Sequence, residues 1–147
     1  MHVRHLARTL GLTACLLAAT ACGSFWHIAD TDGTLEDTML TYAKLVRWGE
    51  LERASLFVDE ELRGDFVALS PGLERLHFTD FDLGPVEFAE EGAGAEVTVV
   101  YHFYDVTTLV ERRIVERQSW TAGGPTRWTV RPDLSGFQTA LGREPSG

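Results

Sequence analysis

The longest run of alternating side chains, at residues 95–105, is the feature that most constrains how this chain can fold. One set of alternate positions is apolar or aromatic: Ala95, Val97, Val99, Tyr101 and Phe103. The other set is more polar: Glu96, Thr98, Val100, His102 and Tyr104. Because successive side chains of a strand point to opposite faces, this pattern predicts a strand with one face toward a core. The fold must therefore contain a sheet with one buried side.

Shorter strands are expected around this one, because apolar segments alternate with turn-forming residues. The segments that favour strands are residues 77–83, 86–90, 108–120 and 126–131, with Trp128 and Val130 inward in the last. Turns are expected at residues 84–85, 91–94, 105–107 and 122–125. Short turns between neighbouring strands predict an antiparallel sheet of four to five strands.

The part of the chain before these strands has helical spacing. Thr34 and Asp37 form a capping-box pattern, and Gly49 follows where the first helix is expected to end. Apolar residues in this stretch recur on one helix face: Leu35, Met39, Tyr42, Ala43 and Val46. A second helix is expected at residues 50–58 and a third at 59–69, before residues 70–72 break the chain. Helices followed by an antiparallel sheet predict an α+β fold.

Charge and cysteine content exclude several classes of function. The chain has 22 acidic and 13 basic residues and a formal net charge of −9. An acidic protein repels nucleic acid and anionic lipid, so no nucleic-acid partner is expected. No cysteine follows Cys22, which excludes thiol catalysis, cysteine-ligated metals and disulfides from the rest of the chain. No cofactor is expected.

The first 21 residues have the pattern of an export signal. Arg4 and Arg8 give a basic start without acidic residues, and a short run of mostly apolar and small residues follows at 9–19. This run is shorter than the roughly 20 residues that a membrane-spanning helix needs. We therefore expect a cleaved signal peptide at residues 1–21 and no lasting membrane span.

This leader ends in Ala19-Thr20-Ala21-Cys22, which resembles the lipobox of bacterial lipoproteins. The resemblance implies that the leader is cut before Cys22, that this cysteine is acylated, and that residues 22–33 are a lipidated tether. The partner of this segment would be the lipid bilayer, because two or more acyl chains anchor a protein stably. The usual lipobox has leucine where this chain has Ala19.

Cys15 is the alternative site of acylation, because Leu12-Thr13-Ala14-Cys15 also resembles a lipobox and includes the leucine. The apolar run before Cys15 would be short, since such runs usually span about 7–15 residues, so Cys22 is preferred. In Gram-negative lipoproteins an aspartate after the cysteine favours retention in the inner membrane. Gly23 stands there instead, which implies an outer-membrane lipoprotein facing the periplasm.

Four segments of the remaining chain carry a second resemblance: residues 42–50 (YAKLVRWGE), 101–104 (YHFY), 118–120 (QSW) and 127–130 (RWTV). They resemble the nuclear transport factor 2-like superfamily, and more closely small bacterial lipoproteins with that cone-shaped, cystatin-like fold. The resemblance implies helices packed on a curved antiparallel sheet at residues 34–131, with a flexible tail at 132–147. A strand that many members place between the second and third helices is not evident in this sequence.

Enzymes of this superfamily commonly use an Asp or a His inside the cone, which makes His102 a candidate for a pocket. Tyr42 and Tyr101 are candidates because aromatic residues could line a pocket for an apolar ligand. His102 and Asp105 would point to opposite faces of a regular strand, so a catalytic pair is not expected. Aromatic side chains more often fill a core than line a pocket. The aromatic residues concerned are Tyr42, Trp48, Phe57, Tyr101, Phe103, Trp120 and Trp128.

The other polar residues give less indication of a metal-binding or ligand-binding site. His77 and His102 are expected on separate strands with no carboxylate at ligand spacing, so no metal site is expected. A cluster of mixed charge is expected to form cross-strand ion pairs on a solvated face, with an anion contact through Arg112 or Arg113 as the alternative. Its members are Glu111, Arg112, Arg113, Glu116 and Arg117.

Three functions are compatible with these patterns. The first is a membrane-anchored, non-enzymatic module that binds an envelope protein or supports an envelope assembly. The second is a binder of a small apolar ligand inside the cone. The third is an isomerase-like or dehydratase-like enzyme. Because the sequence contains no recognisable catalytic motif, the first of these is expected.

Overall fold

The computed structural model describes residues 34–89, 93–123 and 127–143, which form an α+β domain. Helices α1 (Leu35–Arg47), α2 (Leu51–Ala54), α3 (Glu60–Val67) and α4 (Ser70–Leu73) come first. They are followed by strands β1 (Leu76–Leu83), β2 (Glu87–Phe88), β3 (Gly94–Asp105), β4 (Glu111–Ala122) and β5 (Trp128–Pro132), and then by helix α5 (Ser135–Ala140). The predicted α+β order of helices before strands is confirmed, except that α5 follows the last strand.

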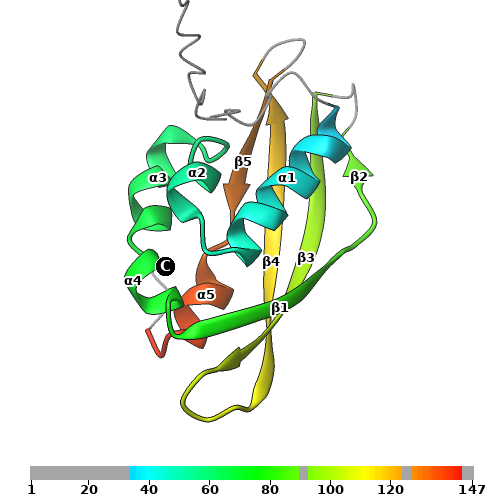
Figure 1. Cartoon of the computed structure of the whole chain (residues 1–147). Coiled ribbons are helices and arrows are strands. Elements are labelled where there is room, and N and C mark those ends of the chain that lie inside the picture. The colour runs from blue at the N-terminus through cyan, green and yellow to red at the C-terminus, as the bar shows by residue number, and fades with distance from the viewer. Residues whose placement is uncertain (1–33, 90–92, 124–126, 144–147) are drawn as a thin grey trace, which may run out of the picture.

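The strands form one antiparallel sheet in the order β1-β3-β4-β5, and the short β2 pairs with the beginning of β3. The long strands β3 and β4 pair along most of their length, with Tyr101 opposite Ile114 and Val99 opposite Glu116. Figure 1 shows α1 lying across one face of the sheet, with α2 and α3 beside β5. The result is an open, curved sheet that carries its helices on one side.

Helix α1 has the boundaries that its sequence predicts. The Thr34 hydroxyl accepts a hydrogen bond from the Asp37 amide at 3.3 Å and donates to the Asp37 carboxylate at 2.9 Å. At the other end, Gly49 has φ +71° and its amide donates to the Val46 carbonyl at 3.0 Å. A glycine takes this left-handed conformation without the steric cost that a Cβ would bring.

The segment between α3 and β1 differs from the prediction of a simple chain break. Residues 70–72 belong to the short helix α4, which has Pro71 in its first turn. Proline is tolerated there because the first amides of a helix have no partner within that helix. Helix α2 is also shorter than expected, since it ends at Ala54.

The segment between α2 and α3 makes a single parallel bridge to β5. Val58 pairs with Val130, the Asp59 amide donates to the Val130 carbonyl at 2.9 Å, and the Val130 amide donates to the Phe57 carbonyl at 2.8 Å. This bridge lies where the resemblance places an additional strand. It fixes the helical layer to the edge of the sheet.

The core fills the space between the helices and the sheet. The face of β3 that was predicted to be buried is buried at all five positions. Rings pack directly across the two layers, as the Tyr42 and Trp120 rings do at 5.8 Å in an edge-to-face contact. The large side chains that are fully buried are Trp120, Tyr42, Tyr101, Phe57, Phe66, Phe103 and Phe137.

Two of the aromatic residues expected in the core are not fully buried. Trp128 is half-buried and packs against the core, and Trp48 is 68% exposed. Trp48 directly follows the last residue of α1, so its side chain does not belong to the helix face that packs on the sheet. The expected filling of the core is confirmed for the remaining five.

The predicted flexible tail from residue 132 is wrong as far as residue 143. Pro132 belongs to β5, and α5 places Phe137 in the core with no exposed surface. The Phe137 and Tyr101 ring centroids are 5.8 Å apart. Leu134, Ala140 and Leu141 also pack against the core, so this segment is part of the domain. Residues 144–147 lie outside the described ranges.

The predictions for the leader and the tether, including those for Cys15 and Cys22, concern residues 1–33 and also lie outside the described ranges. Among the residues that are described, none of the helices has both the length and the apolar composition needed to cross a bilayer.

Candidate functional site

The most unusual group in the interior is the Glu116 carboxyl on β4, which has no exposed surface. Its Oε1 accepts a hydrogen bond from the Tyr42 hydroxyl at 3.0 Å. Its Oε2 accepts one from the Tyr101 hydroxyl at 3.2 Å and one from Gln118 Nε2 at 2.6 Å. A buried carboxyl is costly unless its oxygens are hydrogen-bonded, and here both oxygens have donors from within the protein.

The hydrogen-bond network continues along β4 from Gln118 to Trp120. The Trp120 indole Nε1–H donates to Gln118 Oε1 at 2.9 Å, which leaves the amide nitrogen of Gln118 for Glu116. Side chains two residues apart on a strand share a face. The side chains of Glu116, Gln118 and Trp120 can therefore form a chain of hydrogen bonds beneath α1.

Burial changes the acidity of this group. Removal from water raises the pKa of Glu116 from its ordinary value of 4.5 to about 7, against the opposing effect of its three hydrogen bonds. The nearby charge of Asp133 raises the pKa of this carboxyl further. Burial, with Glu116 beside them, also raises the pKa of Tyr42 and of Tyr101 well above the usual value. Glu116 therefore exchanges a proton near neutral pH, while both phenols remain donors.

The packing around Glu116 leaves little room for a ligand. Tyr42 contacts Phe66 and Trp120 through its ring, and Tyr101 contacts Phe137 in the same way. Glu116, Tyr42 and Tyr101 line none of four clefts on the described part of the chain, whereas Gln118 lines one of them and Trp120 another. The arrangement can hold a proton and fix the two layers together.

Glu116 was not among the predicted site residues, because it was expected with Arg117 on a solvated face. That placement is wrong for Glu116 because Ile114, Gln118 and Trp120 on the same face of β4 are buried. Glu116 lies at alternate positions with these three residues, and this alternation was the signal in the sequence that could have identified it as buried. In the described ranges, the cross-strand ion pairs that were expected from the charged residues of 111–117 are also absent.

Of the three predicted pocket residues, Tyr42 and Tyr101 meet at Glu116 and His102 does not. His102 lies on the outer face of β3, where its Nε2 is 2.9 Å from Asp82 Oδ2. The pocket candidate His102 therefore lies outside the interior, on the face to which its position in the strand pattern assigns it. Asp105 bonds Thr107 instead, so His102 and Asp105 do not form a pair, as expected from their opposite faces.

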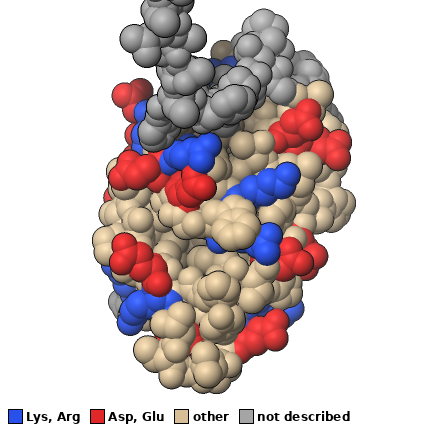
Figure 2. All heavy atoms as spheres, in the orientation of Figure 1, with Lys and Arg blue, Asp and Glu red and all other residues tan. Residues whose placement is uncertain are grey.

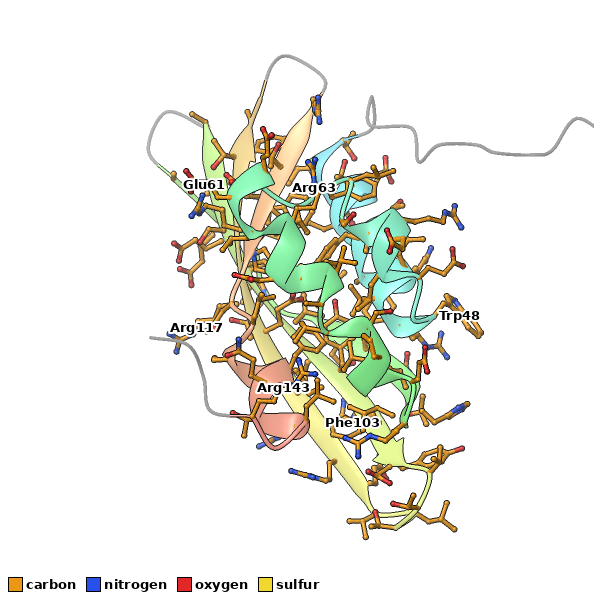
Figure 3. All side chains as sticks on the ribbon, turned by 90° about the vertical axis from the view of Figure 1, so that its left-hand side faces the viewer. Trp48, Glu61, Arg63, Phe103, Arg117 and Arg143 are labelled. Carbon is orange, nitrogen blue, oxygen red and sulfur yellow. The ribbon has the colours of Figure 1, made fainter. Side chains whose placement is uncertain are left out.

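The other histidine and arginine candidates are also outside the interior network. His77 stacks on Tyr104 with ring centroids 4.8 Å apart. Arg112 lies over the Phe103 ring at 5.9 Å, near the end of the sheet where Figure 3 labels Phe103. Nowhere in the described ranges do three or more His, Cys, Asp or Glu side chains gather in a way that could hold a metal ion.

No protein-family model matches this chain, and no curated protein matches it. Solved structures do resemble it. One is the solution structure of a SEC-C motif protein from Rhodopseudomonas palustris, which has 17% identity and a TM-score of 0.54 and covers 67% of this chain and 77% of its own. At this identity the likeness shows the fold alone.

Two further solved structures match with TM-scores of 0.44. One is the intermembrane space region of the chloroplast protein ARC6, at 11% identity, covering 65% of this chain and 88% of its own. The other is a candidate polyketide cyclase from Silicibacter, at 12% identity, covering 76% of this chain and 95% of its own.

Proposed function

We propose that this protein is a membrane-anchored lipoprotein whose nuclear transport factor 2-like domain binds a protein partner of the cell envelope without catalysis. The observation that carries this proposal is the filled interior. Glu116, the buried group best suited to acid-base chemistry, already has its oxygens bonded by Tyr42, Tyr101 and Gln118. Recognition is then expected on the outer surface.

The exposed tip of the β3–β4 hairpin supports a protein partner. Val106, Leu109 and Val110 are 52%, 73% and 56% exposed and lie within five residues of one another. Exposed apolar side chains that are grouped in this way mark interaction sites. Figure 1 shows that this tip lies at the opposite end of the domain from the start of α1. A domain tethered through residues 22–33 would thus present the hairpin away from its anchor.

The surface charge is compatible with this role. On the described part of the face in Figure 2, acidic and basic side chains are interspersed and do not form a patch of one sign. An acidic chain of this kind has little electrostatic attraction for anionic lipid, so the proposed membrane attachment depends on acylation of Cys22. The alternative functions, a ligand in the cone or an isomerase-like enzyme, would both require the interior to open.

The lipid anchor can be tested by mass spectrometry and fractionation of the protein from its native host. We expect a mature amino terminus at an acylated Cys22, in the outer-membrane fraction. Cys22→Ser should abolish acylation, whereas Cys15→Ser is the matched control and should leave it intact. An unmodified Cys22 in the wild-type protein would refute the anchor.

The protein partner can be tested with a photoreactive amino acid placed at the hairpin tip. At position 109 it should crosslink to one defined envelope protein in intact cells. The control position is Glu52 on α2, which is exposed and lies away from the tip, and it should give no such product. Equal crosslinking from both positions, or none from position 109, would contradict the proposal.

A further inference from the structure

A cleft of about 560 Å³ lies where the end of α1 meets α4 and the beginning of β1. Its floor is formed by the apolar side chains of Leu73 and Phe78, which are almost fully buried. Its rim is polar or aromatic and includes Arg47, Trp48, Ser70 and Glu74. A cleft with an apolar floor and a few polar groups is the usual form of a small-molecule site.

Arg47 places a positive charge in the wall of this cleft without a carboxylate partner. Its Nη2 donates to the Thr79 carbonyl, and its guanidinium lies 5.1 Å from the centre of the Trp48 ring. Thr79 is skipped in the pairing of β1 with β3, at a bulge. Among the described residues, no ion pair to Arg47 is present and its buried Nε has no hydrogen-bond partner.

Trp48 adds an exposed aromatic surface beside this cation. The side chain is 68% exposed, and Figure 3 shows it projecting from the body of the domain. An indole offers a broad apolar face, and tryptophan and arginine are the residues most enriched where binding energy is concentrated. The Arg47–Trp48 contact holds the two groups next to each other at the mouth of the cleft.

We propose that this cleft binds a small organic monoanion, a carboxylate with a flat apolar body. The carboxylate pairs with Arg47, and the apolar body lies against Trp48 above Leu73 and Phe78. Glu74 on the rim and the negative end of the α1 dipole disfavour a more highly charged ligand such as a phosphate ester. The inference rests on the proposed function, in which recognition takes place on the outer surface.

The test uses the purified full chain and two probes of the same shape, titrated by calorimetry. The anionic probe is 2-naphthoate and the neutral one is 2-naphthylmethanol. We expect 2-naphthoate to bind about tenfold more tightly, a difference of about 1.4 kcal/mol. Arg47→Gln should remove this preference, and Trp48→Ala should weaken both probes about tenfold. Arg117→Gln, at an exposed position on the outer face of the sheet, is the matched control and should change neither.

Binding that does not distinguish the two probes, or that survives both Arg47→Gln and Trp48→Ala, would overturn the proposal. Equal weakening by Arg117→Gln would do the same, because it would indicate a nonspecific charge effect. Thermal unfolding would check that Arg47→Gln is folded, and Trp48→Ala provides an independent test because its side chain is exposed. This measurement does not depend on Cys22 or on the hairpin tip, so its failure is distinguishable from failure of the anchor or of the protein partner.

Discussion

The Tyr42 hydroxyl on α1 donates to Glu116 on β4 at 3.0 Å, across 74 positions of sequence. This hydrogen bond joins the helical layer to the sheet inside the core, where neither side chain has any exposed surface. Breaking such a contact leaves a buried oxygen without one of its donors, and this cost exceeds the net value of an ordinary hydrogen bond. The stability of the domain should therefore depend on this pair of residues.

Tyr42→Phe removes the hydroxyl and keeps the ring. We expect the free energy of unfolding to fall by about 1–3 kcal/mol, measured by urea denaturation at pH 7. Tyr104→Phe is the matched control, because Tyr104 lies half-buried on the other face of β3, and its effect should stay within about 0.5 kcal/mol. Equal effects of the two substitutions would contradict a special role for the Tyr42–Glu116 bond.

The raised pKa of Glu116 predicts a characteristic dependence of stability on pH. The folded protein binds the Glu116 proton up to about pH 7, whereas the unfolded chain releases it near the ordinary pKa of 4.5. Between these values the folded state holds more protons, so stability falls as pH rises and then becomes constant. The total change from this group is roughly 3 kcal/mol.

Glu116→Gln isolates this effect, because the amide does not ionise. The difference in unfolding free energy between wild type and Glu116→Gln should shift in favour of the variant as pH rises from 5 to 8, measured by urea denaturation at several pH values. Glu96→Gln, at an exposed position of β3, should keep the wild-type dependence. A difference between wild type and Glu116→Gln that does not change with pH would disprove a titrating buried carboxyl.

Two glycines should respond in opposite directions to alanine. A Cβ at Gly136 in α5 would lie 2.6 Å from the Val115 carbonyl oxygen, whereas a Cβ at Gly64 in α3 would meet nothing within 4 Å. We expect Gly136→Ala to destabilise the domain by about 1–3 kcal/mol. Gly64→Ala should stabilise it by about 0.5–1 kcal/mol, since alanine favours the helix. Thermal unfolding of both variants would test this, and a neutral Gly136→Ala would argue against the close packing of α5 on β4.

The contribution of α5 to the fold can be measured through its buried ring. Phe137→Ala should lower the free energy of unfolding by about 3–5 kcal/mol, because it empties a site in contact with Tyr101. Leu109→Ala removes an apolar side chain that is 73% exposed and should have little effect. If Phe137→Ala were as mild as Leu109→Ala, the chain after β5 would not be an integral part of the core.

The main elements of the fold were predictable from local patterns. The alternation at 95–105 gave the buried face of β3, because strand periodicity is a property of neighbouring residues. The Thr34 cap and Gly49 marked the two ends of α1 for the same kind of reason. The Ser-Pro-Gly segment at 70–72 was predicted as a chain break and belongs to a helix, because proline both breaks helices and begins them.

The candidate site was only partly predictable. Tyr42 and Tyr101 were identified as interior residues, but the group that they bond was not. Glu116 has Arg117 beside it and other charged residues nearby, and charged residues are rarely buried unless they are paired. Its partners come from α1, from β3 and from two positions further along β4, and no local pattern reports such an arrangement.

The sequence by itself determined that the first helices precede the strands, which face of β3 is buried and where α1 begins and ends, since each depends on residues close together in the chain. Only the tertiary structure decided that Glu116 is enclosed and that Phe137 completes the core. The physical reason is that burial depends on which surfaces meet. A strand pattern defines two faces, but the helices that cover one of them set the pKa and the partners of every group beneath.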